Sequence, residues 1–132
     1  MKPKVLLYQV PLEKAKQLTS ALAMMGVRTE QVAPGDIYQK VGYLAGADGF
    51  VWEEAPEVQD GDLSAEEFGG EILVMCGFSR MQFEMFMSFF KRKKISPVAI
   101  KAMLTDTNQR WTFARLIREV RTEHMYMTRQ RG

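Results

Sequence analysis

The sequence predicts an α/β fold: a small three-layer sandwich with a mainly parallel four-stranded sheet, built from two strand-helix-strand (βαβ) units plus a C-terminal helix. Short, nearly continuous apolar runs alternate with amphipathic stretches, as in parallel strands covered by helices. Right-handed crossovers then place the helices over the sheet faces. The chain has 132 residues, 46% of them hydrophobic, so we expect a single domain over residues 1–132.

The first unit is expected between residues 4 and 33. Residues 4–10 (KVLLYQV) have the composition of a buried strand, and Pro11 follows at once. A helical face then recurs at three- and four-residue steps, through Ala15, Leu18, Leu22 and Met25. Gly26 is the expected C-cap of this helix. Residues 27–33 alternate less cleanly, which indicates an edge strand before a turn at residues 34–36.

The second unit repeats this plan with stronger signals. Residues 71–77 (EILVMCG) predict a strand buried on both faces, and residues 79–94 predict a helix. Residues 98–104 (VAIKAML) predict a strand that lies beside the strand at residues 71–77 and runs parallel to it. Residues 107–127 predict the last helix.

An acidic connector at about residues 47–71 separates the two units, with nine acids and no Lys or Arg. Long loops are uncommon in compact domains, so some local structure is expected. Residues 37–44 predict a short helix, and Ser64 begins a capping-box pattern. Phe50, Trp52 and Phe68 are expected to hold the segment to the body.

Composition narrows the function classes. Cys76 is the only cysteine and His124 the only histidine, so neither a disulfide framework nor a His/Cys metal site is expected. A reducing, cytoplasmic setting follows, and no apolar stretch has the length of a membrane span. The chain has no dinucleotide-binding glycine motif, P-loop, Cys-x-x-Cys or nucleophile elbow. We therefore predict no cofactor and no catalytic residues.

One candidate ligand site is a polar rim where the two strands of the second unit end. Open α/β sheets bind ligands at such an edge, beside helix N-termini. The candidate anion-binding residues are Gly77, Ser79, Lys101, Thr105 and Asn108. The competing interpretation is stronger, because Ser79 and Gln82 have the spacing of a capping box that satisfies its own helix.

Charge is divided unevenly along the chain. Residues 1–90 carry 7 Lys/Arg against 13 Asp/Glu, whereas residues 91–132 carry 11 against 3. A basic patch for nucleic-acid phosphates is a candidate, formed by Lys91, Arg92, Lys93, Lys94, Arg115, Arg118 and Arg121. Basic residues between apolar helix positions are more often a solvated face, and no nucleic-acid-binding motif accompanies them.

The predicted helix at residues 79–94 carries more apolar side chains than one core-facing stripe needs. The favoured interpretation is a central helix packed beneath the acidic connector and the last helix. The sharper hypothesis is a surface for a protein partner or for self-association, to which flexible methionines are suited. Cys76 and His124 are both interpreted as packing residues.

The chain resembles a family of short bacterial proteins known as domain of unknown function 3783. The likeness rests on residues 41–46 (VGYLAG), 75–79 (MCGFS) and 98–108 (VAIKAMLTDTN), the last followed by Trp111 and Thr112. The resemblance implies a small α/β module and supplies no activity or catalytic residues.

Three functions remain open at this point. The preferred hypothesis is a non-enzymatic binding or regulatory module that acts by surface recognition. The alternative is a phosphate- or small-molecule-binding domain, or an enzyme, that uses the strand ends. The third is nucleic-acid binding through the basic C-terminal third.

Overall fold

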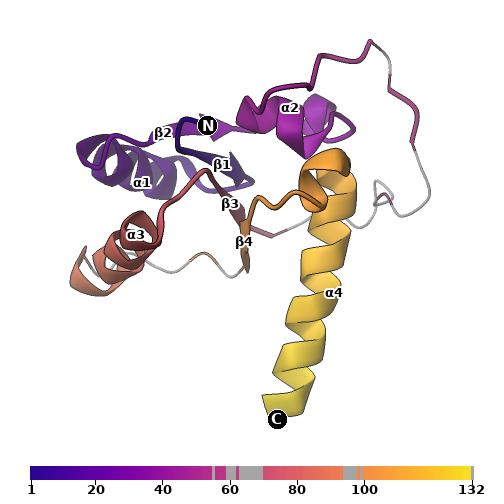
Figure 1. Ribbon diagram of the computed structural model, residues 1–132. Helices are drawn as coiled ribbons and strands as arrows, with labels where there is room; N and C mark the ends of the chain where they lie inside the picture. The colour runs from indigo at the N-terminus through magenta and orange to yellow at the C-terminus, as the bar shows by residue number, and fades with distance from the viewer. Residues whose placement is uncertain (55, 59–61, 63–69, 94–97, 99, 132) are drawn as a thin grey trace.

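The computed structural model describes residues 1–54, 56–58, 62, 70–93, 98 and 100–131 (Figure 1). Its elements are, in chain order, β1 (Lys4–Tyr8), α1 (Leu12–Met24), β2 (Arg28–Gln31), the 3₁₀ turn η1 (Pro34–Asp36), α2 (Val41–Ala45), β3 (Ile72–Cys76), α3 (Arg80–Lys93), β4 (Ile100–Met103), the 3₁₀ turn η3 (Asn108–Arg110) and α4 (Phe113–Arg131). The strand-helix-strand order occurs twice, so the predicted α/β class is confirmed.

The strands form one sheet in the order β2-β1-β3-β4. Pairing is parallel within each unit, where Val5 lies opposite Thr29 and Val74 lies opposite Ala102. The two central strands pair antiparallel, with Leu6 opposite Val74. The sheet is therefore mainly parallel, and the predicted parallel neighbours β3 and β4 are confirmed.

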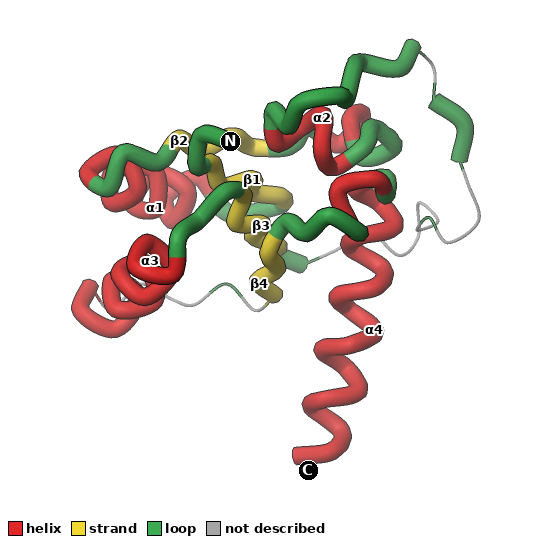
Figure 2. Tube along the Cα trace, in the orientation of Figure 1, coloured by secondary structure: helices red, strands yellow, loops and turns green. Residues whose placement is uncertain are grey.

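Helices cover both faces of the sheet, as Figures 1 and 2 show: α1 and α3 lie on one face, α2 and α4 on the other. Successive strand side chains point to opposite faces. In β1, Val5 and Leu7 pack toward α1 and α3, whereas Leu6 and Tyr8 pack toward α2 and α4. Two right-handed units that run in opposite directions place both of their crossover helices on one face, which explains why α1 and α3 are neighbours.

The edge strands are less buried than the central ones. In β2 only Thr29 is partly buried, and along β4 partly buried and exposed residues alternate. The edge strand expected at residues 27–33 is thus present as the shorter β2. The strand expected at residues 98–104 is β4, which begins at Ile100 and ends at Met103.

The last helix begins later than expected. Residues 108–110 form a single 3₁₀ turn, and Trp111 is extended with ψ 155°, so continuous helix starts only at Phe113. The Trp111 carbonyl accepts a hydrogen bond of 2.9 Å from the Val41 N–H, and the Thr112 hydroxyl accepts one of 3.1 Å from the Arg115 N–H. The N-cap of α4 is therefore Thr112. The helix does not start earlier because the bond to Val41 at the start of α2 keeps Trp111 extended.

The short helix expected within residues 37–44 is present as α2, which begins at Val41. Gly46 follows with φ +78° and ends it in the left-handed region. The capping box expected at Ser64 and the anchor expected at Phe68 lie outside the described residues. Within the described part of the chain, no helix is both long and apolar enough to cross a bilayer.

Candidate functional site

The turn after β3 satisfies its polar groups internally. The Ser79 hydroxyl accepts a hydrogen bond of 3.1 Å from the Gln82 N–H, and the Gln82 side-chain oxygen accepts one of 2.9 Å from the Ser79 N–H. This is the predicted capping box. Gly77 has φ +69°, and a side chain there would meet Met1 at 2.8 Å, so both conformation and space favour glycine.

The turn after β4 uses the same kind of reciprocal bonding. The Thr105 hydroxyl accepts from the Asn108 N–H at 3.0 Å, and the Asn108 side-chain oxygen accepts from the Thr105 N–H at 2.8 Å. The Asn108 amide also donates to the Met103 carbonyl at 2.9 Å. These bonds occupy Thr105 and Asn108 in shaping the turn.

The predicted rim is only partly assembled. Gly77, Ser79, Thr105 and Asn108 follow the C-terminal ends of two adjacent parallel strands. Lys101 instead lies within β4, where its ammonium group is 5.2 Å from the centre of the Phe90 ring on α3. Such a contact favours the cation where it is. Anion binding by this rim stays a prediction.

The two halves of the predicted basic patch lie on opposite faces of the sheet. Lys91 and Arg92 are exposed at the end of α3, Lys93 is its last residue, and Lys94 lies outside the described residues. The other half is on α4, where Arg118 is exposed and Arg121 is partly buried.

Arg115 on α4 has neighbours of its own. Its guanidinium lies 4.5 Å from the centre of the Trp111 ring, and its Nε lies 3.9 Å from a carboxylate oxygen of Glu119. Nucleic-acid binding by the patch stays a prediction.

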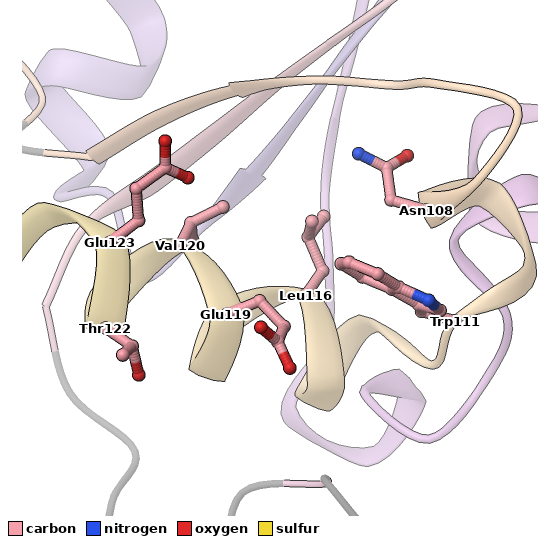
Figure 3. Close-up of a pocket in the computed structure, with 7 residues that line it drawn as sticks. All are labelled: Asn108, Trp111, Leu116, Glu119, Val120, Thr122 and Glu123. Atoms are coloured by element: carbon pink, nitrogen blue, oxygen red, sulfur yellow. The ribbon is translucent and has the colours of Figure 1, made fainter.

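A hollow of about 440 Å³ opens beside Trp111, between the turn after β4 and the first turns of α4 (Figure 3). It is lined by Asn108, Trp111, Leu116, Glu119, Val120, Thr122 and Glu123. The hollow has an apolar floor and two carboxylates, one of which faces Arg115. The described residues contain no group of three or more acidic, His or Cys side chains that could hold a metal ion.

Cys76 is buried at the end of β3, beneath α2 and α4. Burial raises the pKa of its thiol to about 12, and the nearby Lys4 lowers it only in part. The thiol is therefore protonated at neutral pH, and a protonated, inaccessible thiol is not a nucleophile. This agrees with the packing role expected from the sequence. The His124 side chain lies outside the described set.

The most distinctive surface lies between α1 and α3. A groove of about 440 Å³ is lined by Ala21, Met24, Met25, Met85, Phe89 and Arg92, and we call it the methionine groove. Met24 is 91% exposed and Met85 47% exposed. A shallower hollow continues along α3 past Met81, which is 71% exposed. Met81 and Met85 supply the surplus apolar surface expected on residues 79–94. The expected packing of this helix beneath the last helix is wrong, because α3 packs with α1 and α4 covers the other face of the sheet.

The contribution of α1 to the groove was not expected. Met24 lies next to Met25 and off the apolar stripe of α1, so helical spacing gave it no core role. The sequence indicated only that Met24 is an apolar residue with no predicted packing role. Beneath the groove, Phe86 is fully buried, with Phe78 and Phe90 at ring distances of 6.0 and 5.1 Å.

The start of the acidic connector forms a fixed platform over α2. The Gln39 amide donates a 2.7 Å hydrogen bond to the Glu53 carbonyl, and its oxygen accepts one of 3.0 Å from the Glu53 N–H. The Phe50 ring lies so close to Gly42 that a side chain at Gly42 would meet it at 2.7 Å. Farther along, the Thr112 hydroxyl donates to the Asp62 carboxylate. We call residues 48–54 and 56–58 the acidic platform.

Part of the acidic platform faces solvent. Trp52 meets the Tyr43 ring edge-on at 5.8 Å but remains 53% exposed. Val51 and Val58 are exposed as well, beside the exposed acids Asp48, Glu54 and Glu57. Phe50 and Trp52 thus contact the body as expected, while the platform also presents apolar side chains outward.

Comparison with known protein families gives a match over part of the chain. Residues 71–127 match the domain of unknown function DUF3783, a stretch that runs from the start of β3 into α4. Two of the three stretches that carried the resemblance lie inside this match, and residues 41–46 lie outside it. Curated proteins and solved structures yield no match. Over residues 71–127 the chain is therefore similar to the domain of unknown function DUF3783.

Proposed function

We propose that this protein is a non-enzymatic binding module that recognises a protein partner through the methionine groove. The observation that carries the proposal is the exposure of Met24 and Met85 around a hollow between two helices. Met81 is exposed at the adjoining hollow along α3. Apolar surface in contact with water is unfavourable, and a partner that covers it gains the corresponding free energy.

The chemistry of the groove suits recognition better than catalysis. Methionine side chains are flexible and polarizable, so they adapt to the shape of a partner. The groove has one basic residue in its lining, Arg92, and Lys91 is exposed beside it on α3. An apolar centre with charge at its edge is the usual composition of a protein interface.

The other two predicted functions have less support. At the strand ends, Ser79, Thr105 and Asn108 bond within their own turns, which leaves fewer groups for an anion. The described basic residues of α3 and α4 lie on helices that cover opposite sheet faces, which gives less support to one continuous surface for a nucleic acid. A cytoplasmic location belongs to the same proposal, since the only cysteine is a buried thiol suited to a reducing compartment.

A pull-down with matched variants tests this function. Met85→Glu places a charge in the groove, whereas Leu12→Glu places the same charge on an exposed apolar position at the other end of α1. We expect the wild type and Leu12→Glu to retain the same proteins from a lysate of the native host, and Met85→Glu to lose them. Circular dichroism melts check that both variants fold.

Two outcomes contradict the proposal. One is a wild-type protein that retains no partner and sediments only as a monomer. The other is a retained set that Met85→Glu leaves unchanged, because binding would then use some other surface.

A further inference from the structure

We propose that the methionine groove binds a second copy of this chain, whose acidic platform inserts Trp52 between α1 and α3. This inference rests on the function proposed above and names the partner. It commits to a contact between two different surfaces, a groove on one copy and a platform on the next.

The two surfaces are complementary in charge. The acidic platform exposes Asp48, Glu54 and Glu57, and residues 47–71 contain no Lys or Arg. The methionine groove has Arg92 in its lining, and the adjacent residue of α3, Lys91, is also exposed. Opposite potentials steer such surfaces together and disfavour pairing of like with like.

The two surfaces are also complementary in apolar content. The platform presents Val51, Trp52 and Val58 to solvent, an unusual exposure for a tryptophan and two valines within ten residues. The groove presents Met24 and Met85 around a hollow of about 440 Å³, a size suited to a bulky side chain such as an indole. Tryptophan and methionine are both enriched at interface centres.

The platform is held ready for docking. Gln39 fixes the backbone of Glu53 through two hydrogen bonds, and Phe50 packs on Gly42. These contacts hold the backbone on either side of Trp52, so less conformational freedom is lost when the ring is buried.

The contact must join two molecules. The platform packs on α2, whereas the groove lies between α1 and α3 on the opposite face of the sheet (Figure 1). A chain therefore cannot insert its own Trp52 into its own groove. A groove-to-platform contact leaves one free surface of each kind on every pair, so association continues into rings or longer chains.

Complementation of two variants tests the geometry. Met85→Glu blocks the groove and leaves the platform intact, whereas Trp52→Glu removes the inserted ring and leaves the groove intact. In sedimentation velocity we expect the wild type and the Leu12→Glu control to associate with rising concentration, and each blocked variant alone to stay monomeric. An equimolar mixture of the two variants should form a dimer and nothing larger.

A fluorescence measurement provides a second readout. In a Trp111→Phe background Trp52 is the only tryptophan, and its emission should shift to the blue as concentration rises. High salt should weaken the association and reduce the shift, because the charges at the edge are exposed and screened.

The outcomes separate this inference from the proposed function. A wild-type protein that stays monomeric at the highest soluble concentration overturns self-association, and so does a variant mixture that fails to dimerise when the wild type does. If the pull-down still depends on Met85 in either case, the groove binds a different protein and the binding function stands. If that dependence is also absent, both proposals fail.

Discussion

The two faces of the sheet are closed in different ways. Among the described residues, the buried polar side chains all lie on the α2 and α4 side, and they are Gln39, Asp62, Asn108 and Thr112. Each takes part in a hydrogen bond. On the α1 and α3 side the buried cluster is apolar, and methionines form its margin.

This difference separates what specifies the fold from what is available for binding. Hydrogen bonds are directional, so these separate buried bonds restrict how α2, α4 and the connector can be arranged. Apolar contact is not directional, and a methionine that touches water can exchange it for a partner. Mutation of the buried polar residues on the α2 and α4 side is therefore expected to change stability. Mutation of the exposed methionines on the α1 and α3 side is expected to change association.

The largest effect on stability is expected in the two buried cores. It tests whether the two faces of the sheet have equally tight cores and differ only in the residues around them. Phe86 is fully buried under α3, and Phe113 is fully buried under α4, where its ring meets Tyr8 at 5.6 Å. Replacement of either by Ala should lower the free energy of unfolding by about 3–5 kcal/mol, because each leaves a cavity in a packed core. Urea denaturation measures this.

Equal losses would show that both cores are equally tight. A loss below about 1 kcal/mol at Phe86 would mean that the α1 and α3 side is loosely packed throughout, beyond its margin.

The second prediction concerns Cys76 and high pH. Because the folded chain keeps the thiol proton up to a pKa of about 12, whereas an unfolded thiol titrates near 9.0, the folded state binds more protons between these values. Stability from this group is complete below pH 9 and should fall by about 1.4 kcal/mol for each pH unit above it, up to the folded pKa.

Denaturation at pH 8 to 11 measures the decline, with Cys76→Ala as the control. The variant should lose most of the dependence and keep a part from Tyr8, whose pKa burial also raises above 10.0. A wild-type profile as flat as that of the variant would contradict the burial of the thiol.

The third prediction removes the polar anchor of the platform. Gln39→Ala deletes both side-chain hydrogen bonds to Glu53 and leaves its backbone groups without these partners. The free energy of unfolding should fall by about 1–3 kcal/mol. Hydrogen exchange at the Glu53 amide should accelerate more than exchange in β1 and β3. Unchanged exchange at Glu53 would show that Phe50 and Asp62 hold the platform without Gln39.

The core strands could be predicted from sequence because their signal is local. Residues 4–10 and 71–77 are nearly continuous apolar runs, and only a strand covered on both faces satisfies such a run. The direction of one unit relative to the other carries no such signal. It depends on how the long connector returns the chain, so the antiparallel pairing of β1 with β3 was not specified beyond a mainly parallel sheet.

The start of α4 and the role of Gln39 could not be predicted for a related reason. Both depend on partners distant in sequence, since Trp111 is held extended by Val41, and Gln39 is buried only because Glu53 folds back over it. Glutamine is usually exposed, and its type gave no indication of burial. The methionine surplus was visible on α3, but the groove required knowing that α1 lies beside it.

The smallest change in stability is expected at Met85, the residue next to Phe86, where one of the largest is expected. Met85→Gln keeps the length of the side chain at a half-exposed position, so the free energy of unfolding should change by no more than about 0.5 kcal/mol. Association should nevertheless weaken, since an amide in the groove must be desolvated without a partner. Urea denaturation and sedimentation of the same sample measure both. A destabilisation as large as that of Phe86→Ala would place Met85 in the core. The exposed methionines could then no longer be separated, as residues for binding, from the residues that stabilise the fold.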